Sequence, residues 1–557
     1  MFNFIKKFLE KGKKKYNKTN KSTRASQLIN SIKGISISKE KEKKIVLDPR
    51  FPKFIIKPAN HIYKLQNVTK TKSVKYPLIE PYAYANIVWN HATDELVYNV
   101  VEPILSTREK DMLKKITDGL IQTIDVSLTH IKSGEFLTRY LESKVQKIIE
   151  AYQMKISPIQ YLKIMYYIYR NFVGLNKIEP LMHDPNIEDI GVDGVGIPAY
   201  IVHRKYGSIK TNIIFNDLEK LREFVIKLSE KCDRYISYAE PLLDGALPDG
   251  SRVQASLSND VTTKGPTFSI RKFKKIPFTP IEMIKDGTLS SEMLSYLWFL
   301  VENGSNILIC GGVSTGKTTL LNAISMFIPP ESKIVSIEDT RELNLPHENW
   351  IPSVSRIGFG SSTIGEVSMF DLLKESFRQN PDYIIVGEVR GKEAYILFQA
   401  MSSGHPSIAT MHGGSTDAIV KRLETPPIEL PTGLLESLDI IVIMVHARER
   451  GESARRVREI DEIRSIDAES GKANYSKVFK WIPSNDSFEF SGNSWVLEKI
   501  SKDKGISTIE IKKELATRKK FIDWMHDSDI VDMKEITKFI QMYYKDRKKL
   551  LEIIEKN

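Results

Sequence analysis

The clearest chemistry in the sequence is a phosphate-binding pattern in the middle of the chain. The stretch NILICGGVSTGKTTLLNAIS contains G-x-x-x-x-G-K-[ST] between an apolar run, Ile307 to Ile309, that predicts a strand and a periodic run that predicts a helix. Glycines let such a loop wrap tightly, so that backbone N–H groups and the helix N-terminus face phosphate oxygens. Lys317 would reach the β- and γ-phosphates, and the Thr318 hydroxyl would bind Mg²⁺. The predicted nucleotide-binding residues are Gly311, Gly312, Val313, Ser314, Thr315, Gly316, Lys317, Thr318 and Thr319.

Two acidic strand ends follow this loop. In PDYIIVGEVRG an apolar run predicts a strand that ends at Glu388, where the usual acid of such sites is Asp. Because open α/β sheets bind ligands at the carboxyl ends of strands, Glu388 is predicted to support the metal together with Thr318. In KIVSIEDTREL, Glu338 and Asp339 end another predicted strand. Such a pair is more often a loop or helix cap, but its place one strand beyond the phosphate loop favours a catalytic role.

A pair of histidines lies further along the chain. The stretch SSGHPSIATMHGGS places His405 and His412 on either side of a predicted strand, Ser407 to Met411. A loose pair of this kind is usually structural or exposed. Without a cysteine or a third ligand nearby, it does not predict a metal site.

Composition limits what kind of protein carries these residues. The chain has 557 residues, 41% of them hydrophobic, which predicts two to four folded domains. Its two cysteines, Cys232 and Cys310, exclude a disulfide framework and a four-cysteine zinc site, and they favour a reducing, cytosolic setting. The longest apolar runs, such as Ile440 to Val445, are far shorter than the roughly 20 residues that cross a bilayer, so no transmembrane helix is expected.

The positive charge of the chain is confined to its start. The whole chain has a net charge of +12, but the first 60 residues hold 17 Lys and Arg against 4 Asp and Glu. This composition predicts a mostly disordered tail. Phe2, Ile5 and Leu9 fall at helical spacing among lysines, which indicates a short basic helix on an anionic membrane surface. A solvated lysine tail and a nucleic-acid arm are the alternatives, and the second is disfavoured because no basic stripe continues into the body.

The remaining sequence predicts an α/β chain. Strand and helix patterns alternate irregularly up to a Lys- and Pro-containing linker at 272–280, and a strand–helix–strand rhythm follows, which is typical of a parallel sheet covered by helices. The predicted parts are a basic, mostly disordered tail at 1–75, an α+β domain at 76–275, a P-loop domain at 276–485 and a helical C-terminal extension at 486–557.

These motifs together resemble the secretion ATPase superfamily, which includes the motors of type II secretion, type IV pili and archaella. The phosphate loop, IEDTREL, GEVRG and GHPSIATMHGGS come in the order and spacing of that family. Three further stretches resemble its archaeal branch, namely IEDIGVDGVGIPAYIVHRKYGSIKTNI, LPDGSRVQAS and GPTFSIRKF. The resemblance implies a RecA-like P-loop ATPase core, a flexibly linked α+β N-terminal domain, and assembly into a homohexamer that uses ATP and Mg²⁺.

The resemblance also implies roles for single residues. Glu338 would activate the attacking water, Glu388 would support the metal, and His405 and His412 would sense the nucleotide. Hydrolysis needs positive charge near the γ-phosphate, and an arginine from the N-terminal domain can supply it. The candidates in matching motifs, each of which could instead be a surface arginine, are Arg204, Arg252 and Arg271, with Arg234 a weaker fourth.

Three functional hypotheses follow. The first is an ATPase of the cytoplasm, peripherally associated with the cytoplasmic membrane, which docks on a polytopic membrane platform protein and drives pilin-like subunits. The second is a RecA-like helicase or DNA-transfer ATPase, which the histidines and Glu388 disfavour. The third is a ring without turnover, which the intact Lys317, Glu338 and Glu388 disfavour. The motifs leave open which filament is driven, whether it is assembled or retracted, and which arginines act.

Overall fold

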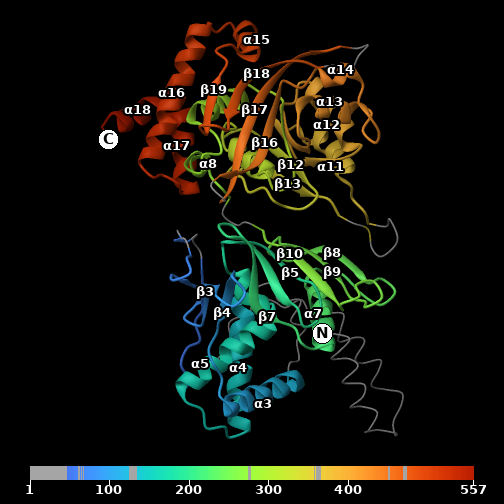
Figure 1. Cartoon of the computed structure of the whole chain (residues 1–557), viewed down its shortest axis with the longest axis vertical. Coiled ribbons are helices and arrows are strands. Elements are labelled where there is room, and N and C mark those ends of the chain that lie inside the picture. Colours follow the sequence, from blue (N-terminus) through green and yellow to red (C-terminus); the bar gives the residue numbers. More distant parts are fainter. Residues whose placement is uncertain are drawn as a thin grey trace. The chain divides into compact units, whose positions relative to one another are not determined.

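The computed structural model describes residues 47–59, 63, 65, 66, 68–123, 134–273, 277–356, 358, 365–449, 452–467 and 473–556. The chain divides into two compact units, unit 1 up to Lys272 and unit 2 from Phe273 (Figure 1). The predicted membrane-binding helix of the tail and residues 274–276 of the predicted linker lie outside the described residues. Among the helices that are described, none is long and apolar enough to cross a membrane.

Unit 1 contains a ten-stranded sheet in the order β1-β2-β3-β4-β7-β6-β5-β10-β9-β8. Its neighbouring strands run antiparallel except for β4 and β7, which are parallel. The strands are β1 (Lys57–Pro58), β2 (Val74–Glu80), β3 (Ala83–Asn90), β4 (Glu95–Val101), β5 (Ile187–Val192), β6 (Pro198–His203), β7 (Gly207–Ile214), β8 (Leu242–Ala246), β9 (Arg252–Ser256) and β10 (Thr267–Arg271).

The helices of unit 1 share one apolar core with this sheet. They are α3 (Thr107–Thr123), α4 (Gly134–Ala151), α5 (Pro158–Ile168), a π-helical turn (Tyr169–Val173), a 3₁₀ turn (Asn176–Ile178), α6 (Glu179–Met182) and α7 (Leu218–Lys231). Helix α7 begins after Asp217, whose carboxylate accepts hydrogen bonds from the backbone N–H groups of Glu219 and Lys220. Asp217 thus satisfies two N–H groups that have no partner within the helix.

Unit 1 begins earlier than the sequence predicts. Residues 47–75 were expected to belong to the disordered tail, but β1 pairs with β2, and Phe54 is buried in the core. The backbone N–H of Phe54 donates to the buried carboxylate of Glu142 at 3.2 Å. The physical reason is the apolar content of RFPKFIIKP, whose aromatic and aliphatic side chains gain more from burial than this short segment loses in freedom.

Unit 2 contains a nine-stranded sheet in the order β13-β12-β14-β15-β11-β16-β17-β18-β19. The strands from β13 to β16 in this order are parallel, and those from β16 to β19 are antiparallel. The strands are β11 (Ile307–Gly311), β12 (Ile334–Glu338), β13 (Trp350–Val354), β14 (Tyr383–Val389), β15 (Ser407–His412), β16 (Ile440–Glu449), β17 (Glu452–Ile466), β18 (Ala473–Ile482) and β19 (Ser487–Phe490).

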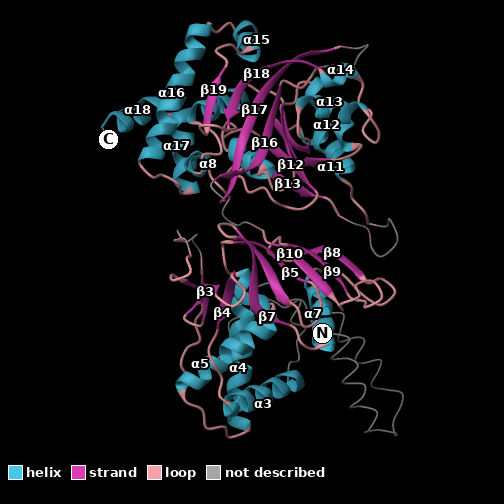
Figure 2. Ribbon diagram, viewed as in Figure 1, coloured by secondary structure: helices cyan, strands magenta, loops and turns pink. Residues whose placement is uncertain are grey.

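Helices cover both faces of this sheet, and Figure 2 shows the two groups on opposite sides of its strands. In β11, Ile307 and Ile309 face one core, whereas Leu308 and Cys310 face the other. The first core includes residues of α8 (Pro280–Lys285), α9 (Ser291–Glu302) and α10 (Lys317–Ser325). The second includes residues of α11 (Met369–Ser376), α12 (Glu393–Ser402), α13 (Thr416–Glu424) and α14 (Thr432–Leu435), with a 3₁₀ turn at Phe377–Gln379.

The C-terminal extension is part of the first of these cores. Its helices are α15 (Trp495–Lys504), α16 (Thr508–Asp527), α17 (Met533–Lys545) and α18 (Arg547–Lys556). Arg518 of α16 is 2% exposed, pairs with Glu302 and Glu514, and lies over the ring of Trp298 at 5.0 Å. The extension is helical as expected, except that β19, inside the predicted range, joins the core sheet.

Candidate functional site

The phosphate loop lies where the sequence predicts it, between the end of β11 and the start of α10. Gly311 and Gly316 have φ of +159° and +93°. A Cβ on Gly311 would lie 2.6 Å from both the Met444 carbonyl oxygen and the Thr315 hydroxyl, so only glycine fits. Val313 is 79% exposed and Thr315 is buried, while Thr318 and Thr319 are half-buried in the first turn of α10. The free N–H groups of that turn make the loop an anion-binding cradle.

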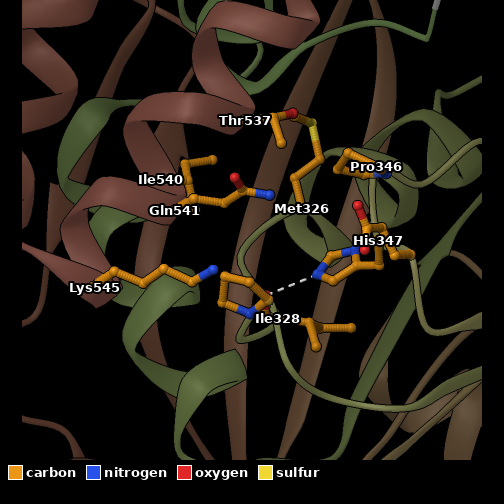
Figure 3. A pocket seen from close by; sticks show the side chains of 10 residues that line it. Met326, Ile328, Pro346, His347, Thr537, Ile540, Gln541 and Lys545 are labelled. Carbon is orange, nitrogen blue, oxygen red and sulfur yellow. Dashed lines mark hydrogen bonds between the residues drawn. The ribbon is translucent and has the colours of Figure 1, made fainter.

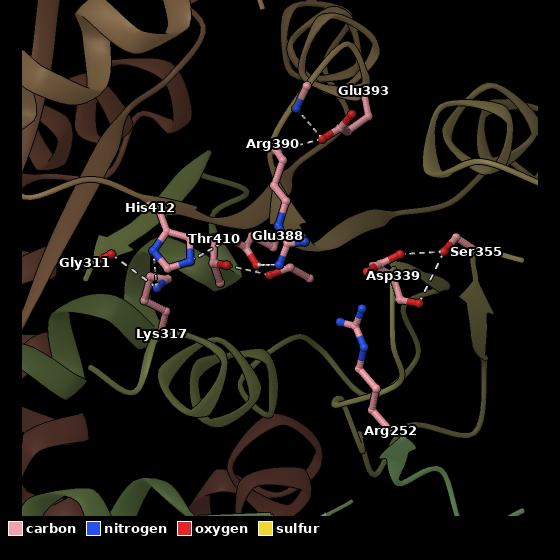
Figure 4. Close-up of polar contacts among 12 residues, drawn as sticks. Arg252, Gly311, Lys317, Asp339, Ser355, Glu388, Arg390, Glu393, Thr410 and His412 are labelled. Atoms are coloured by element: carbon pink, nitrogen blue, oxygen red, sulfur yellow. Dashed lines mark hydrogen bonds and ion pairs between the residues drawn. The ribbon is translucent and has the colours of Figure 1, made fainter. Parts of the chain in front are cut away.

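Lys317 reaches back across this loop and is 8% exposed. Its Nζ donates to the carbonyl oxygens of Gly312 at 2.8 Å and Gly311 at 3.2 Å, and it lies 3.4 Å from Nδ1 of His412 (Figure 4). The strand register explains the last contact, because β11 and β15 are parallel neighbours in which Gly311 and His412 are partners. The structure therefore brings together the loop lysine and the second predicted histidine.

Glu388 continues this row of polar groups. Its Oε1 lies 2.9 Å from Nε2 of His412, and its Oε2 accepts a 2.6 Å hydrogen bond from Arg390 (Figure 4). Burial opposes ionisation of Glu388, but the hydrogen bond and charge of Arg390, with the charge of Lys317, keep its pKa below the ordinary value. Burial and the neighbouring Lys317 charge lower the pKa of His412. Glu388 is thus an ionised carboxylate, as a metal ligand must be.

Glu338, at the end of β12, has a different environment. It is 1% exposed, and its Oε1 accepts backbone hydrogen bonds from Glu342 and Leu343, both at 2.9 Å. Its Oε2 is buried and has no hydrogen-bond partner among the described residues. Burial raises the pKa of Glu338 to about 7, although the two backbone hydrogen bonds act to lower it. A carboxyl group with this pKa can accept a proton near neutral pH, which is what a general base requires.

A glycine permits Glu338 to approach β14. A Cβ on Gly387 would lie 3.0 Å from Cγ of Glu338, which is closer than side chains normally pack. Between Val386 and Val389 the register of β14 against β15 shifts, so Gly387 and Glu388 form an irregularity at the strand end. The carbonyl of Gly387 accepts a 2.6 Å hydrogen bond from the Thr410 hydroxyl. The neighbouring Asp339 accepts a 2.9 Å hydrogen bond from Ser355.

His405 does not join this edge of the sheet, contrary to the predicted role in sensing nucleotide. It precedes β15, whereas His412 ends that strand, so the two lie about 20 Å apart along it. The His405 ring packs edge-on against Phe377 with centroids 5.6 Å apart, and its Nδ1 lies 3.2 Å from the Ser403 hydroxyl. Since the two histidines flank β15, His405 lies at the opposite edge of the sheet from His412, where it packs against Phe377.

The predicted arginines gather at one end of the unit 1 sheet. Arg271 of β10 and Arg252 of β9 are register partners, and Arg271 also pairs with Asp189 of β5. Arg204 follows β6, and its backbone N–H donates to the Asn186 carbonyl directly before β5. Arg252 forms a 2.9 Å ion pair with Asp244, while Arg271 is exposed. The sheet register thus brings these three residues to neighbouring strand ends, although their sequence positions are far apart.

The sequence reasoning missed a group of polar side chains on β17. Arg455 donates to the carbonyl of Ser314 in the phosphate loop at 3.0 Å, and Arg458 donates to the carbonyl of Gly414, two residues after His412, at 2.7 Å. The stretch ESARRVREI is rich in arginine, and this was the available signal. It carries no motif that would distinguish it from an exposed charged strand.

A cavity of about 160 Å³ lies elsewhere in unit 2, between the end of α10 and the C-terminal extension (Figure 3). Met326, Ile328, Pro346 and His347 line one side, and Thr537, Ile540, Gln541 and Lys545 line the other. Nε2 of His347 lies 2.8 Å from the Ile328 carbonyl oxygen. None of these residues belongs to the phosphate-site group, so the cavity is separate from that site.

Two family models match the chain. One, described as type II/IV secretion system protein, matches residues 177–475, which is more than half of the chain. The chain belongs to the type II/IV secretion system protein family. A second model, described as PilB3-like, C-terminal, matches residues 485–557. The predicted RecA-like P-loop core, separate α+β N-terminal domain and helical C-terminal extension are confirmed.

Several individual proteins are also similar to this chain. An uncharacterized protein of Methanocaldococcus jannaschii, MJ0900, is 35% identical over 89% of this chain and 92% of that protein. The type IV secretion system protein PtlH of Bordetella pertussis is 32% identical over 43% of this chain and 79% of its own length. The solved Legionella pneumophila ATPase DotB matches with a TM-score of 0.37 and 14% identity, over 64% of this chain and 92% of DotB. The chain is thus similar to type II/IV secretion system proteins and, over its C-terminal residues, to PilB3-like proteins.

Proposed function

We propose that the chain is a Mg²⁺-dependent ATPase that acts as a homohexamer and powers a type IV pilus-like, archaellum or type II secretion filament. One observation carries the proposal, namely the convergence of Lys317, His412, Glu388 and Glu338 at the edge of the sheet beside the phosphate loop. The relatives from Methanocaldococcus jannaschii support a place in the archaeal branch.

The residues present fit ATP and Mg²⁺. The cradle has no room for a side chain at Gly311, Gly316 has a φ of +93° that disfavours one, and the first turn of α10 offers backbone N–H groups to phosphate oxygens. Lys317 would bind the β- and γ-phosphates, and the Thr318 hydroxyl and the ionised Glu388 would hold Mg²⁺. The metal, when bound, supplies positive charge that neutralises the phosphate oxygens.

The protein's own groups then have separate tasks. Glu338 accepts the proton of the attacking water at its unpartnered Oε2. His412 stays neutral near physiological pH, because burial and Lys317 oppose its protonation, so it contacts Lys317 and Glu388 without adding charge. The burial of Glu338 and Lys317 excludes water that would otherwise weaken these interactions.

Other parts of the chain support wider features of the proposal. The unit 1 arginines, Arg252, Arg271 and Arg204, would supply positive charge to the γ-phosphate, and a hinge at 272–280 would let unit 1 move. The family assignment supports a polytopic membrane platform as partner and a place at the cytoplasmic membrane.

The basic start of the chain would bind anionic lipid, at about 1 kcal/mol per basic residue near the surface. Deletion of residues 1–46 should weaken liposome binding and leave basal turnover intact, because the buried Phe54 is kept.

The test is phosphate release by the purified full chain with ATP, with and without Mg²⁺. We expect Mg²⁺-dependent turnover that Lys317→Ala abolishes and that Lys374→Ala, an exposed lysine on α11, leaves unchanged. Anionic vesicles and single-stranded DNA are then added separately. Stimulation by vesicles supports the secretion motor, whereas strong stimulation by DNA with strand separation would support the helicase and overturn it.

A further inference from the structure

One residue of the phosphate loop has a backbone conformation that its side chain disfavours. Ser314 has φ of +59°, in the left-handed region, and it is exposed, so no packing of its own side chain holds it there. Gly311 and Gly316 adopt their positive φ angles without cost, but a serine does not. Something outside the loop must therefore stabilise this conformation if it is to predominate.

Arg455 makes a contact that can do this. Its Nε donates to the carbonyl oxygen of Ser314 at 3.0 Å, 141 residues away in sequence. Its side-chain stem lies against Gly316, since a Cβ on that glycine would be 3.2 Å from Cδ of Arg455. The arginine therefore contacts the loop on both sides of Thr315, at the strained residue and at the glycine before Lys317.

The strand that carries Arg455 is anchored by its neighbours. Arg456 is 4% exposed, forms two 2.8 Å hydrogen bonds to Asp486, and donates to the carbonyl of Asp286 at 3.0 Å. Further along β17, Glu462 is fully buried and accepts 2.6 Å hydrogen bonds from the Tyr296 hydroxyl and the backbone N–H of Trp495 at the start of α15. Arg455 thus extends from a fixed support that also holds the C-terminal extension.

A β-bulge in β17 places Arg458 against the loop that follows His412. Ile443 pairs with Glu459 and Met444 pairs with Val457, so Arg458 is an extra residue between them. Bulges of this kind redirect side chains next to active sites. Here Arg458 donates to Gly414 at 2.7 Å, in the loop after His412.

We propose that Arg455 is a positioning residue that holds Ser314 and, with it, the phosphate loop in the conformation that binds the phosphates of a nucleoside triphosphate. The inference rests on the proposed function of the loop. When only a fraction of molecules has the binding conformation, the apparent affinity falls by that fraction. Arg455 raises the fraction by stabilising a conformation that serine alone disfavours.

A double-mutant cycle separates this role from general stabilisation. Arg455→Met keeps the aliphatic stem over Gly316 and removes the donor, and Ser314→Gly removes the strain. Arg455→Met should weaken binding of Mg-ADP about 10-fold when Ser314 is present and about 2-fold in the Ser314→Gly background. The second effect is smaller because glycine adopts the left-handed conformation without the contact from Arg455. Arg455→Lys, which keeps a donor, should recover part of the loss. Arg464→Ala, an exposed arginine on the same strand, is the matched control and should bind as the wild type does.

Hydrogen exchange of the nucleotide-free protein gives a second readout. The peptide that covers the phosphate loop should exchange faster in Arg455→Met, while peptides of β18 keep the wild-type rate. An Arg455→Met change that costs the same affinity with and without Ser314→Gly, or that leaves affinity unchanged, would overturn the inference. A wild-type chain that binds no nucleotide would overturn the proposed function instead, so the two failures are distinct.

Discussion

The carboxyl ends of β12 and β14 each carry a glutamate, and their surroundings differ sharply. Glu388 lies between Arg390 and His412, with Lys317 nearby, and its pKa is lowered. Glu338 is almost completely buried, accepts only uncharged backbone donors at Oε1, and its pKa is raised to about 7. Two glutamates on adjacent strands thus have pKa values shifted in opposite directions, down at Glu388 and up at Glu338.

In the proposed mechanism, this difference lets one sheet edge supply both a metal ligand and a base. A carboxylate that binds a cation must stay ionised, whereas a general base must have a pKa near the working pH. Charge partners provide the first condition at Glu388, and burial provides the second at Glu338. Pairs of titratable groups whose environments separate their pKa values commonly mark the acid–base assignment of a site.

The largest effect should follow removal of the base. Glu338→Gln keeps the volume and the acceptor at Oε1 but cannot take a proton, so turnover should fall by roughly 10² to 10⁴, the usual contribution of a positioned general base. ATP affinity should stay within about threefold, because only a transition-state interaction is lost. Glu342→Gln, which retains its backbone donor to Glu338, is the control. Retained turnover in Glu338→Gln would remove this residue from the mechanism.

Substitution of the second glutamate should act through the metal. Glu388→Gln removes the charge beside His412 and Lys317, so turnover should fall at limiting Mg²⁺ by at least about 10- to 100-fold, the range that loss of a hydrogen-bond partner of a metal ligand commonly costs. High Mg²⁺ should restore part of the activity. Glu375→Gln, on the exposed side of α11, should behave as the wild type. A loss that no Mg²⁺ concentration relieves would argue against a ligand role.

The pH dependence of turnover should report Glu338 and not Glu388. Since the base must be deprotonated, kcat should rise as pH increases through about 7 and level off above it. Glu388, with a lowered pKa, is ionised across this range and adds no inflection. The residual activity of Glu338→Gln should lack the rise near pH 7. A wild-type profile that is flat between about pH 6 and 8 would contradict the assignment.

The smallest effect should be a pH-dependent change in stability. The folded pKa of Glu338 exceeds the unfolded one, so the buried carboxyl is tolerated below about pH 4.5 and becomes increasingly destabilising as pH rises through 7. Glu338→Gln should therefore stabilise the protein at about pH 8, by on the order of 3 kcal/mol, and much less at about pH 4. Thermal unfolding at the two pH values measures this. An equal change at both would show that Glu338 is not buried as a proton-binding group.

Local sequence pattern predicted the elements that carry the phosphate site. The run before Gly311 and the glycine spacing of the loop are properties of neighbouring residues, and β11 and α10 follow them closely. Apolar runs in the sequence likewise predicted the strands that end at or next to Glu338 and Glu388. Which strands are neighbours is not a local property, and the pairing of β11 with β15 is what brings His412 to Lys317.

Two errors have the same origin. His405 and His412 are close in sequence, but a parallel strand between them sends them to opposite edges of the sheet. Phe54 belongs to a segment with a basic overall composition, and its burial depends on β2 and Glu142, which are distant in the chain. The contact of Arg455 with Ser314 was also beyond prediction, because it joins residues 141 positions apart.

The comparison of the two glutamates is tested most directly by a Mg²⁺ titration of ATP binding in the wild type, Glu338→Gln and Glu388→Gln. We expect the Mg²⁺ concentration for half-maximal binding to increase only in Glu388→Gln, and Glu338→Gln to bind MgATP as the wild type does while hydrolysing it roughly 10² to 10⁴ times more slowly. A shift in Glu338→Gln, with none in Glu388→Gln, would contradict the separate roles of the two strand ends.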